Sequence, residues 1–250
     1  MAAYTKMESK EVTGLPGQNA VSTWTGTISV DGPNTTRLHR SNYVTPDQVI
    51  ASLDYYIPYK VFGTNWGTRF NVFYKAYSAS NGSFIYTNDF NGDGVNNDMI
   101  YIPANDSEIQ FKTEADRIAF WAFVAQDDYL NSHRGQYAEP YAARAPWLHR
   151  FDIRIAQDFQ VKVGSTKHKL QLTADIINFG NMLNSKWGIP KNAQVSNYLR
   201  ILKYEGVDDS NKPVFSMYKV NGEYPTKSYE TNMSYSNCWK LQLGIKYFFN

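Results

Sequence analysis

The sequence predicts an all-β fold, and three observations carry the prediction. Apolar and polar residues alternate with a period of two along several stretches, which places each set on one face of a strand. The connections between these stretches are alternately short and long, and the apolar faces begin and end in aromatic residues. These features are typical of an antiparallel transmembrane β-barrel, so we expect part of a barrel wall with about six strands.

The alternation is clearest in the last stretch, residues 238–250. About eleven residues are enough for a tilted strand to cross the hydrocarbon layer of a membrane. For this stretch alone, a strand of a soluble sandwich is the alternative. The polar face carries Lys240, Gln242, Gly244 and Lys246, and the apolar face consists of Trp239, Leu241, Leu243, Ile245, Tyr247 and Phe249.

The first half of the chain predicts a hairpin that follows a long loop. Residues 2–10 form a short polar strand candidate, and residues 11–43 collect Gly, Pro, Asn, Thr and Ser, as loops do. Residues 45–57 and 67–77 alternate as two strands, and a short turn over residues 58–66 joins them. We therefore expect these two strands to pair.

The connection over residues 78–146 is too long for a turn. Within it, residues 113–130 show a helical pattern, in which Thr113 can cap the N-terminus while Glu114 and Asp116 favour the helix dipole. We therefore expect a short helix inside a long loop.

The second half repeats the arrangement of the first. Residues 148–159 and 168–179 alternate as two strands around a short turn over residues 160–167. The alternation slips near Ile177, which predicts a β-bulge at that point.

The last long connection, residues 180–237, is expected to contain a small hairpin that pairs residues 198–204 with residues 214–220. Because short and long connections alternate strictly, all short turns fall at one edge of the predicted meander and all long loops at the other. In a bacterial outer membrane the turns face the periplasm and the long loops face outward. We therefore expect extracellular long loops and a periplasmic C-terminus.

Composition narrows the classes of protein. The chain has 250 residues and a formal net charge of +2, so no strong field directs it to nucleic acid. Aromatic residues make up 16% of the chain, which fits interfacial girdles and also carbohydrate-binding sandwiches. The sequence contains no run of about eighteen apolar residues, so it predicts no transmembrane helix. The first residues lack the pattern of a signal peptide, so we expect either a cytoplasmic chain or one whose beginning is missing.

The polar faces of the middle and last strands carry charges of both signs. Mixed charges are expected where strands face the lumen of a barrel. The alternative is the exposed face of a half-buried soluble sheet. The charged residues are Arg150, Asp152, Arg154, Asp158, Asp175 and Lys240.

One segment of the long middle connection spaces oxygen atoms as a calcium loop does. Gly94 stands at the sixth place, where a sharp turn is needed, but Ile100 stands at the twelfth place instead of the usual Glu. The alternative is a Gly/Asn turn whose acidic side chains are solvated. The candidate ligands are Asp89, Asn91, Asp93, the carbonyl of Val95 and, in place of the Glu, Asp98.

The sequence contains no catalytic constellation, so we do not expect an enzyme. The histidines His39, His133, His149 and His168 lack zinc-ligand spacing, and the single cysteine, Cys238, excludes an internal disulfide and is expected to fill space at a strand end. Aromatic residues of the loops either line a substrate vestibule or pack the loops on one another, and packing is favoured. These residues are Tyr129, Tyr137, Tyr141, Trp147, Trp187 and Tyr198.

A series of motifs runs through the chain: L-P-G-Q-N at 15–19, L-H-R-S at 38–41, D-F-N-G-D-G-V-N-N-D at 89–98 followed by I-Y-I-P, A-P-W-L-H-R-F-D-I-R at 145–154, and L-T-A-D-I-I-N-F-G-N-M-L-N at 172–184. In this order and spacing the chain resembles the C-terminal part of TonB-dependent outer-membrane receptors, in the branch with a carboxypeptidase-regulatory-like N-terminal domain. The final Y-F-F-N is similar to the aromatic C-terminal insertion signal of that family, with one additional Asn. The resemblance covers essentially the whole chain.

The resemblance implies a barrel of about twenty-two strands filled by an N-terminal plug. About six strands do not close such a barrel, and nothing here matches the plug, the TonB-contacting segment or the signal peptide, so residues 1–250 are expected to be the C-terminal part of a receptor. The implied function is TonB-energised uptake of a nutrient or other solute across a Gram-negative outer membrane. The implied partners are TonB through the plug, outer-membrane lipid and a surface lipoprotein. A soluble calcium-dependent glycan-binding β-sandwich module is the alternative.

Overall fold

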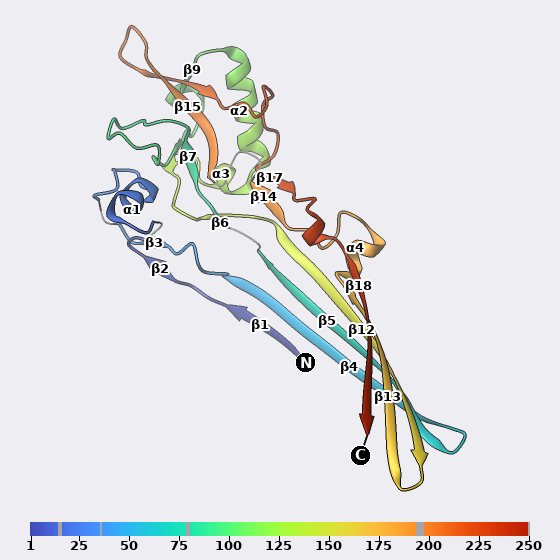
Figure 1. Cartoon of the computed structure of the whole chain (residues 1–250). Helices are drawn as coiled ribbons and strands as arrows, with labels where there is room; N and C mark the ends of the chain where they lie inside the picture. The colour runs from blue at the N-terminus through green and yellow to red at the C-terminus, as the bar shows by residue number, and fades with distance from the viewer. Residues whose placement is uncertain (15–16, 36, 79–80, 194–197, 250) are drawn as a thin grey trace.

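The computed structural model describes residues 1–14, 17–35, 37–78, 81–193 and 198–249. It is mostly β, with 48% strand and 15% helix, and its large sheet is antiparallel, as the sequence predicts. The long strands form one sheet, and parts of the long connections fold into a smaller unit beyond one end of it, as Figure 1 shows. We call the smaller unit, residues 81–144 and 198–228, the outer unit. Residues 15–16 of L-P-G-Q-N, residues 79–80 and 194–197 of the long connections, and Asn250 lie outside the described residues.

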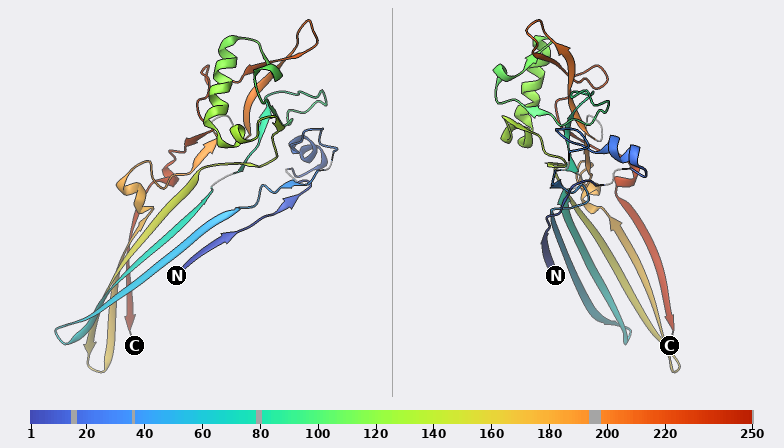
Figure 2. Two further views of the ribbon diagram at one scale, coloured as in Figure 1. Left: turned by 180° about the vertical axis from the view of Figure 1, so that it is seen from behind. Right: turned by 90° about the vertical axis from the view of Figure 1, so that its left-hand side faces the viewer.

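The large sheet has six strands in the order β1-β4-β5-β12-β13-β18. All neighbouring strands are antiparallel, and the short strand β1 and the last strand β18 form its two edges, as the right-hand view of Figure 2 shows. The strands expected from the sequence are therefore confirmed. Their bounds are β1 Ala2–Lys6, β4 Asp47–Val61, β5 Thr64–Ser78, β12 Trp147–Val163, β13 Thr166–Ile177 and β18 Lys240–Phe249.

The two short turns are tighter than predicted, because the flanking strands continue to two-residue hairpin loops. Phe62 and Gly63 have φ values of 48° and 75°, and Gly164 has a φ value of 63°. Such left-handed turns match the twist of the paired strands. Pro58 lies inside β4, opposite Gly67 of β5.

The register of the sheet separates two faces. The row Leu53–Val72–Ile153–Ile176–Leu241 crosses five strands on one face. The next row, Asp54–Asn71–Arg154–Asp175–Gln242, crosses the same strands on the other face. Because side chains alternate along every strand, the sheet is apolar on one side and polar on the other.

The hydrophobic core lies in the outer unit and not against the large sheet. Four strands, β7 (Phe84–Tyr86), β15 (Leu199–Val207), β16 (Pro213–Met217) and β9 (Gln110–Phe111), form a second sheet, and α2 (Glu114–Gln126) contacts β16. The predicted small hairpin is confirmed as β15 and β16, which are antiparallel with Tyr204 opposite Phe215. The largest fully buried side chains are Phe84, Phe120, Phe123, Ile85, Met99, Ile100, Ile102, Leu130, Leu199, Ile201, Leu202 and Val124.

The predicted helix over residues 113–130 is confirmed, with one interruption. Thr113 caps α2, and its hydroxyl accepts the Asp116 N–H at 3.1 Å. Asp127 then ends α2 and caps α3 (Asp128–Ser132), because its carboxylate accepts the Leu130 N–H at 2.9 Å. A second helix therefore begins where the sequence pattern looked continuous.

Two predictions about loops are corrected. Residues 11–43 are not a continuous loop, because α1 (Ala20–Gly26) begins there with a capping box between Asn19 and Ser22. The expected bulge near Ile177 is absent, since β13 ends at Ile177 and Asn178, with a φ value of 57°, turns the chain into α4 (Phe179–Leu183).

The remaining elements are short and belong to the long connections. No helix in the described part of the chain is long and apolar enough to span a membrane. The short strands and 3-10 helices are β2 Lys10–Glu11, β3 His39–Arg40, β6 Asn81–Gly82, β8 Tyr101–Ile102, β10 Gln136–Tyr137, β11 Ala143–Arg144, β14 Lys191–Ala193, β17 Tyr229–Thr231, η1 Asp106–Glu108 and η2 Tyr235–Asn237.

Candidate functional site

The apolar face of the large sheet is uncovered. Leu243 and Ile245 of β18 keep 74% and 73% of their surface exposed although both are aliphatic. No described segment covers this face, since large side chains stay exposed on it from β4 to β18. Apolar surfaces of this extent mark contact with a protein or a membrane. We call the face the apolar belt, and its exposed members include Leu53, Tyr55, Ile57, Phe70, Ile155, Leu170, Leu172, Leu241, Leu243 and Ile245.

Aromatic rings border the apolar belt at both ends. The ring centroids of Tyr74 and Phe151 lie 4.6 Å apart at the long-loop end, and those of Trp66 and Phe159 lie 4.8 Å apart at the turn end. Such rings favour a water–lipid interface. From Trp239 to the end of β18 the strand runs about 33 Å, which a tilt of about 40° reduces to about 25 Å in height. Apolar bands of outer-membrane barrels are about this tall.

Polar side chains within the apolar belt satisfy one another. Gln157 accepts hydrogen bonds from Tyr59 Oη at 2.9 Å and from Thr68 Oγ1 at 2.7 Å, and its own amide donates to the Gly67 carbonyl at 3.2 Å. In an apolar environment an unpaired polar group is costly, so this mutual bonding keeps the face compatible with an apolar solvent.

The opposite face of the sheet is polar, and most of its charges in the middle of the strands are paired. Paired charges of this kind suit a water-filled space on that side. These ion pairs are Arg69–Asp54 at 3.5 Å, Arg150–Asp152 at 3.2 Å and Arg154–Asp175 at 2.5 Å, and Lys169–Asp158 at 2.7 Å lies closer to the turns.

A buried asparagine ties the strand ends together at the long-loop edge. The Asn178 N–H donates to Asp152 of β12 at 2.7 Å. The side-chain amide of Asn178 donates to the carbonyls of Gly188 and Asn237 at 2.9 and 2.8 Å. Asn178 therefore joins the end of β13 to β12 and to the segment before β18, which gives a structural role to the motif at residues 172–184.

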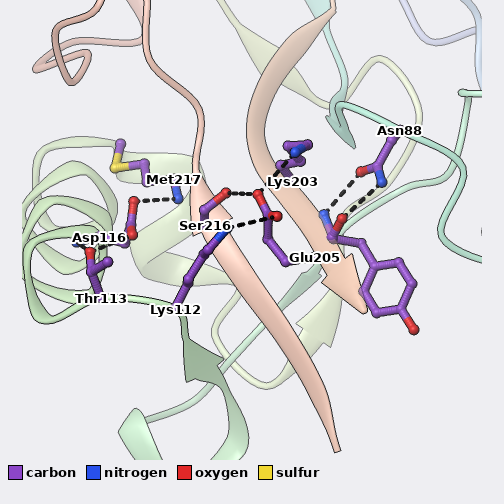
Figure 3. A network of polar contacts seen from close by, with 9 residues as sticks. Asn88, Lys112, Thr113, Asp116, Lys203, Glu205, Ser216 and Met217 are labelled. Atoms are coloured by element: carbon purple, nitrogen blue, oxygen red, sulfur yellow. Dashed lines mark hydrogen bonds and ion pairs between the residues drawn. The ribbon is translucent and has the colours of Figure 1, made fainter. Parts of the chain in front are cut away.

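Polar contacts fix α2 and the strands of the outer unit to one another, as Figure 3 shows. Asp116 of α2 accepts the Met217 N–H of β16 at 3.0 Å. On β15, Glu205 accepts bonds from Ser216 at 2.7 Å and from Lys203 at 3.0 Å, and these bonds lower the pKa of the Glu205 carboxyl to about 2. The outer unit is thus held by a buried core and by charge-assisted bonds.

A cavity of about 420 Å³ lies at the long-loop end, between the β2–β3 ribbon, residues 27–31 and residues 137–140. Lys10 and Arg40 are direct cross-strand partners in that ribbon and line the cavity, and Arg40 Nε lies 3.9 Å from Glu139 Oε2. An exposed ion pair of this length contributes little stability. A charged solute can therefore compete for these side chains.

A second cavity of about 300 Å³ shares Glu8 and Arg40 with the first, so the two are neighbours. Sequence reasoning missed both cavities, because their walls come from segments far apart in the chain. The one local signal is the two cations, Lys10 and Arg40, and it depends on knowing that β2 pairs with β3.

The candidate calcium ligands are brought together in one turn, but their oxygens accept backbone N–H groups. Asp98 is buried and accepts the N–H groups of Phe90 and Asn91, while Asp89 accepts three N–H groups of the following loop. Burial raises the pKa of Asp98, and the nearby charges of Asp93 and Asp89 raise it further. Among the described residues, no three His, Cys, Asp or Glu side chains are placed to hold one metal ion. The candidate ligand set also includes Asn91 and the carbonyl of Val95, and the calcium site stays a prediction from the sequence.

The loop aromatics divide between packing and exposure. Tyr129, Tyr141 and Tyr198 pack against the core of the outer unit. Tyr137 is half exposed and lines the larger cavity, while Trp147 and Trp187 are exposed.

The histidines have structural neighbours. The Nδ1 atoms of His149 and His168 lie 2.7 and 2.6 Å from tyrosine hydroxyl oxygens. His133 stacks on Tyr129, and His39 lines the larger cavity. Cys238 is half-buried and lies beside the carbonyl of Ser234.

Comparison of the chain with protein-family models, with curated proteins and with solved structures returns no match. The apolar belt, the polar face and the cavities are therefore the features that point to a function.

Proposed function

We propose that this chain forms part of the wall of a TonB-dependent outer-membrane receptor that takes up a nutrient or other solute. The apolar belt is the observation that carries the proposal. Its side chains stay exposed between two aromatic borders, and covering each large side chain with an apolar solvent contributes roughly 1.5–3 kcal/mol. Lipid is the solvent that fits a face bordered in this way.

The open edges of the sheet support a larger wall. β1 and β18 each have one neighbouring strand, and a membrane does not accommodate an open sheet edge. Further strands of the same wall would pair there, as the resemblance to receptors implies. In that arrangement the two-residue turns lie in the periplasm and the outer unit lies outside the cell.

The proposed role in uptake involves no bond chemistry. The cavities beside the outer unit contact solute, the polar face lines the path through the wall, and TonB supplies the energy through the plug. A surface lipoprotein would cover the outer unit. Nucleic acid has no part in this function.

The alternative, a soluble calcium-dependent glycan-binding sandwich, requires a second sheet packed on the apolar face. The second sheet of the described residues lies in the outer unit, and the apolar belt stays exposed. This observation favours the wall. Monomeric solubility without detergent would favour the sandwich.

Neighbouring residues on opposite faces of β18 test the proposal. In the full-length protein with Cys238→Ser, single cysteines at Leu243 and at Gln242 are labelled with a polarity-sensitive dye in purified outer membranes. We expect the dye at Leu243→Cys to be quenched by brominated lipid and the dye at Gln242→Cys, the matched control, to be quenched by a water-soluble quencher. Equal quenching of both by the water-soluble quencher, or recovery of the protein in the soluble fraction, would refute the wall.

A further inference from the structure

On the polar face, charges are paired in the middle of the strands and mostly unpaired toward the turn end. In its middle, Arg69, Arg150 and Arg154 lie beside carboxylates. At the turn end, four exposed lysines form no ion pair with any residue that the structure describes, and a fifth, the half-buried Lys169, binds Asp158. We call these lysines the basic turn edge, which consists of Lys60, Lys162, Lys167, Lys169 and Lys246.

The lysines repel one another, and few carboxylates offset them. Lys162 and Lys167 are direct cross-strand partners, and like charges in that position are destabilising. No Asp or Glu occurs in residues 55–68, 159–174 or 243–249, so the stretches that form the turn end supply no acidic side chain beyond Asp158. A cluster of one sign favours an anionic occupant.

The face on which the lysines lie argues against lipid as that occupant. Lys246 is opposite Gln171, and Lys169 is opposite Gln160, in rows that alternate with the rows of the apolar belt. Lysines of the basic turn edge therefore project to the polar side of the sheet, away from the face that the proposed function assigns to the bilayer.

The width of the cluster argues for an extended anion. Lys60 on β4 and Lys246 on β18 are separated by the strands β5, β12 and β13, a distance of about 19 Å at about 4.8 Å per strand. A single phosphate or carboxylate does not span this distance. Lysines present flexible point charges, which suit carboxylates at variable spacing rather than one planar group.

We propose that the basic turn edge binds an acidic polypeptide segment, rich in Asp and Glu, which approaches the polar face from the turn side. The charge cluster stands independently of the proposed function, whereas the periplasmic location of the partner rests on it. Binding of this kind is electrostatic, so it weakens as salt shortens the range of the charges.

A labelled Glu-rich peptide is the probe. Its binding to the full-length protein in uncharged detergent is measured by fluorescence anisotropy at low and high salt. The variant Lys60→Gln/Lys162→Gln/Lys167→Gln is compared with the wild type. We expect about tenfold weaker binding in the triple variant, because each exposed charge contact contributes roughly 0.2–1 kcal/mol.

The matched control removes three exposed lysines at the long-loop end, in the variant Lys186→Gln/Lys191→Gln/Lys212→Gln. Unchanged binding in the control, with a melting temperature that is not lowered in either variant, supports the proposal. Equal losses in both variants would overturn it, and so would a basic turn edge that binds phosphatidylglycerol nanodiscs but not the peptide. A protein that is soluble without detergent and still binds the peptide through these lysines would refute the proposed function and leave this inference standing.

Discussion

Substitution of Gly67 by alanine gives a direct test of how the large sheet is packed. On the polar face, the ring of Tyr56 lies over Gly67, its cross-strand diagonal neighbour, and a Cβ atom at Gly67 would meet Tyr56 Oη at 2.1 Å and Cζ at 2.4 Å. Real Cβ atoms do not approach other atoms so closely, so the ring must move. Arg69 lies over the same ring, with its guanidinium carbon 5.2 Å from the centroid, and would lose this contact.

Two opposing effects set how much Gly67→Ala changes the free energy of unfolding. Displacement of a packed ring costs about 1–3 kcal/mol, and the lost cation–π contact adds about 0.5–1 kcal/mol. Alanine is favoured over glycine in a strand by roughly 0.5–1 kcal/mol, which offsets part of this loss. We expect Gly67→Ala to lower the free energy of unfolding by about 1–3 kcal/mol.

A double-mutant cycle isolates the contact. Unfolding of the full-length protein in detergent by urea is followed by tryptophan fluorescence for wild type, Gly67→Ala, Tyr56→Ala and the double variant. Without the ring, Gly67→Ala should become neutral or slightly stabilising, so the coupling energy should exceed about 1 kcal/mol. An equal loss of unfolding free energy from Gly67→Ala in the wild type and in Tyr56→Ala would refute the role of the ring. Gly67 has no positive φ value, so Gly67→Ala tests the clash alone, whereas Gly164→Ala, whose Cβ would meet no atom within 4 Å, shows the strain of a positive φ value without a clash.

Three further predictions concern the outer unit. Asp116→Ala should lower the stability of the outer unit by about 2–3 kcal/mol, because the buried Met217 N–H loses its acceptor. Hydrogen exchange at the Met217 amide should then accelerate, and unchanged exchange would contradict the role of this bond. The pKa of Glu205 is about 2 in the folded state against an ordinary 4.5, so its contribution is present above pH 4.5 and is lost as the pH falls toward 2. Acid unfolding should therefore show a smaller pH dependence in Glu205→Gln, and an identical pH profile would exclude Glu205 as the cause. Because the carboxylates of the candidate calcium loop accept N–H bonds, we expect calorimetric titration to give no heat below millimolar calcium, whereas stoichiometric heat that disappears in Asp93→Asn would establish the site predicted from the sequence.

The faces of the strands were predictable because apolar and polar residues alternate along each strand. A slip by one residue would move Leu241 and Leu243 from the apolar to the polar face, so the pattern excludes slips by an odd number of residues between β13 and β18. Strand ends were less predictable. Pro58 was expected in the turn, but β4 continues past it to Val61, and Gly67, which was expected to begin the second strand, lies inside β5 and accommodates the ring of Tyr56.

Long-range features could not be inferred in the same way. The cavity around Arg40 requires the pairing of β2 with β3 and the approach of residues 137–140. The helix α1 did carry a local signal, since Asn19 and Ser22 form a capping box, but the many Gly, Pro and Thr residues around it favoured a loop. The basic turn edge likewise appears only when two hairpins are aligned.

The outer unit and the large sheet treat large apolar side chains in opposite ways, and this contrast supports the proposed function. In the outer unit, Phe84 and Phe120 are 0% exposed, so this sequence builds a closed core where its surroundings are water. In the same chain Leu243 is 74% exposed, and Leu172 and Ile155 on the same face of the sheet are exposed as well. A uniform aqueous environment explains the first arrangement and not the second. A sheet that meets lipid on one side and water on the other accounts for both arrangements, because lipid then covers the apolar belt.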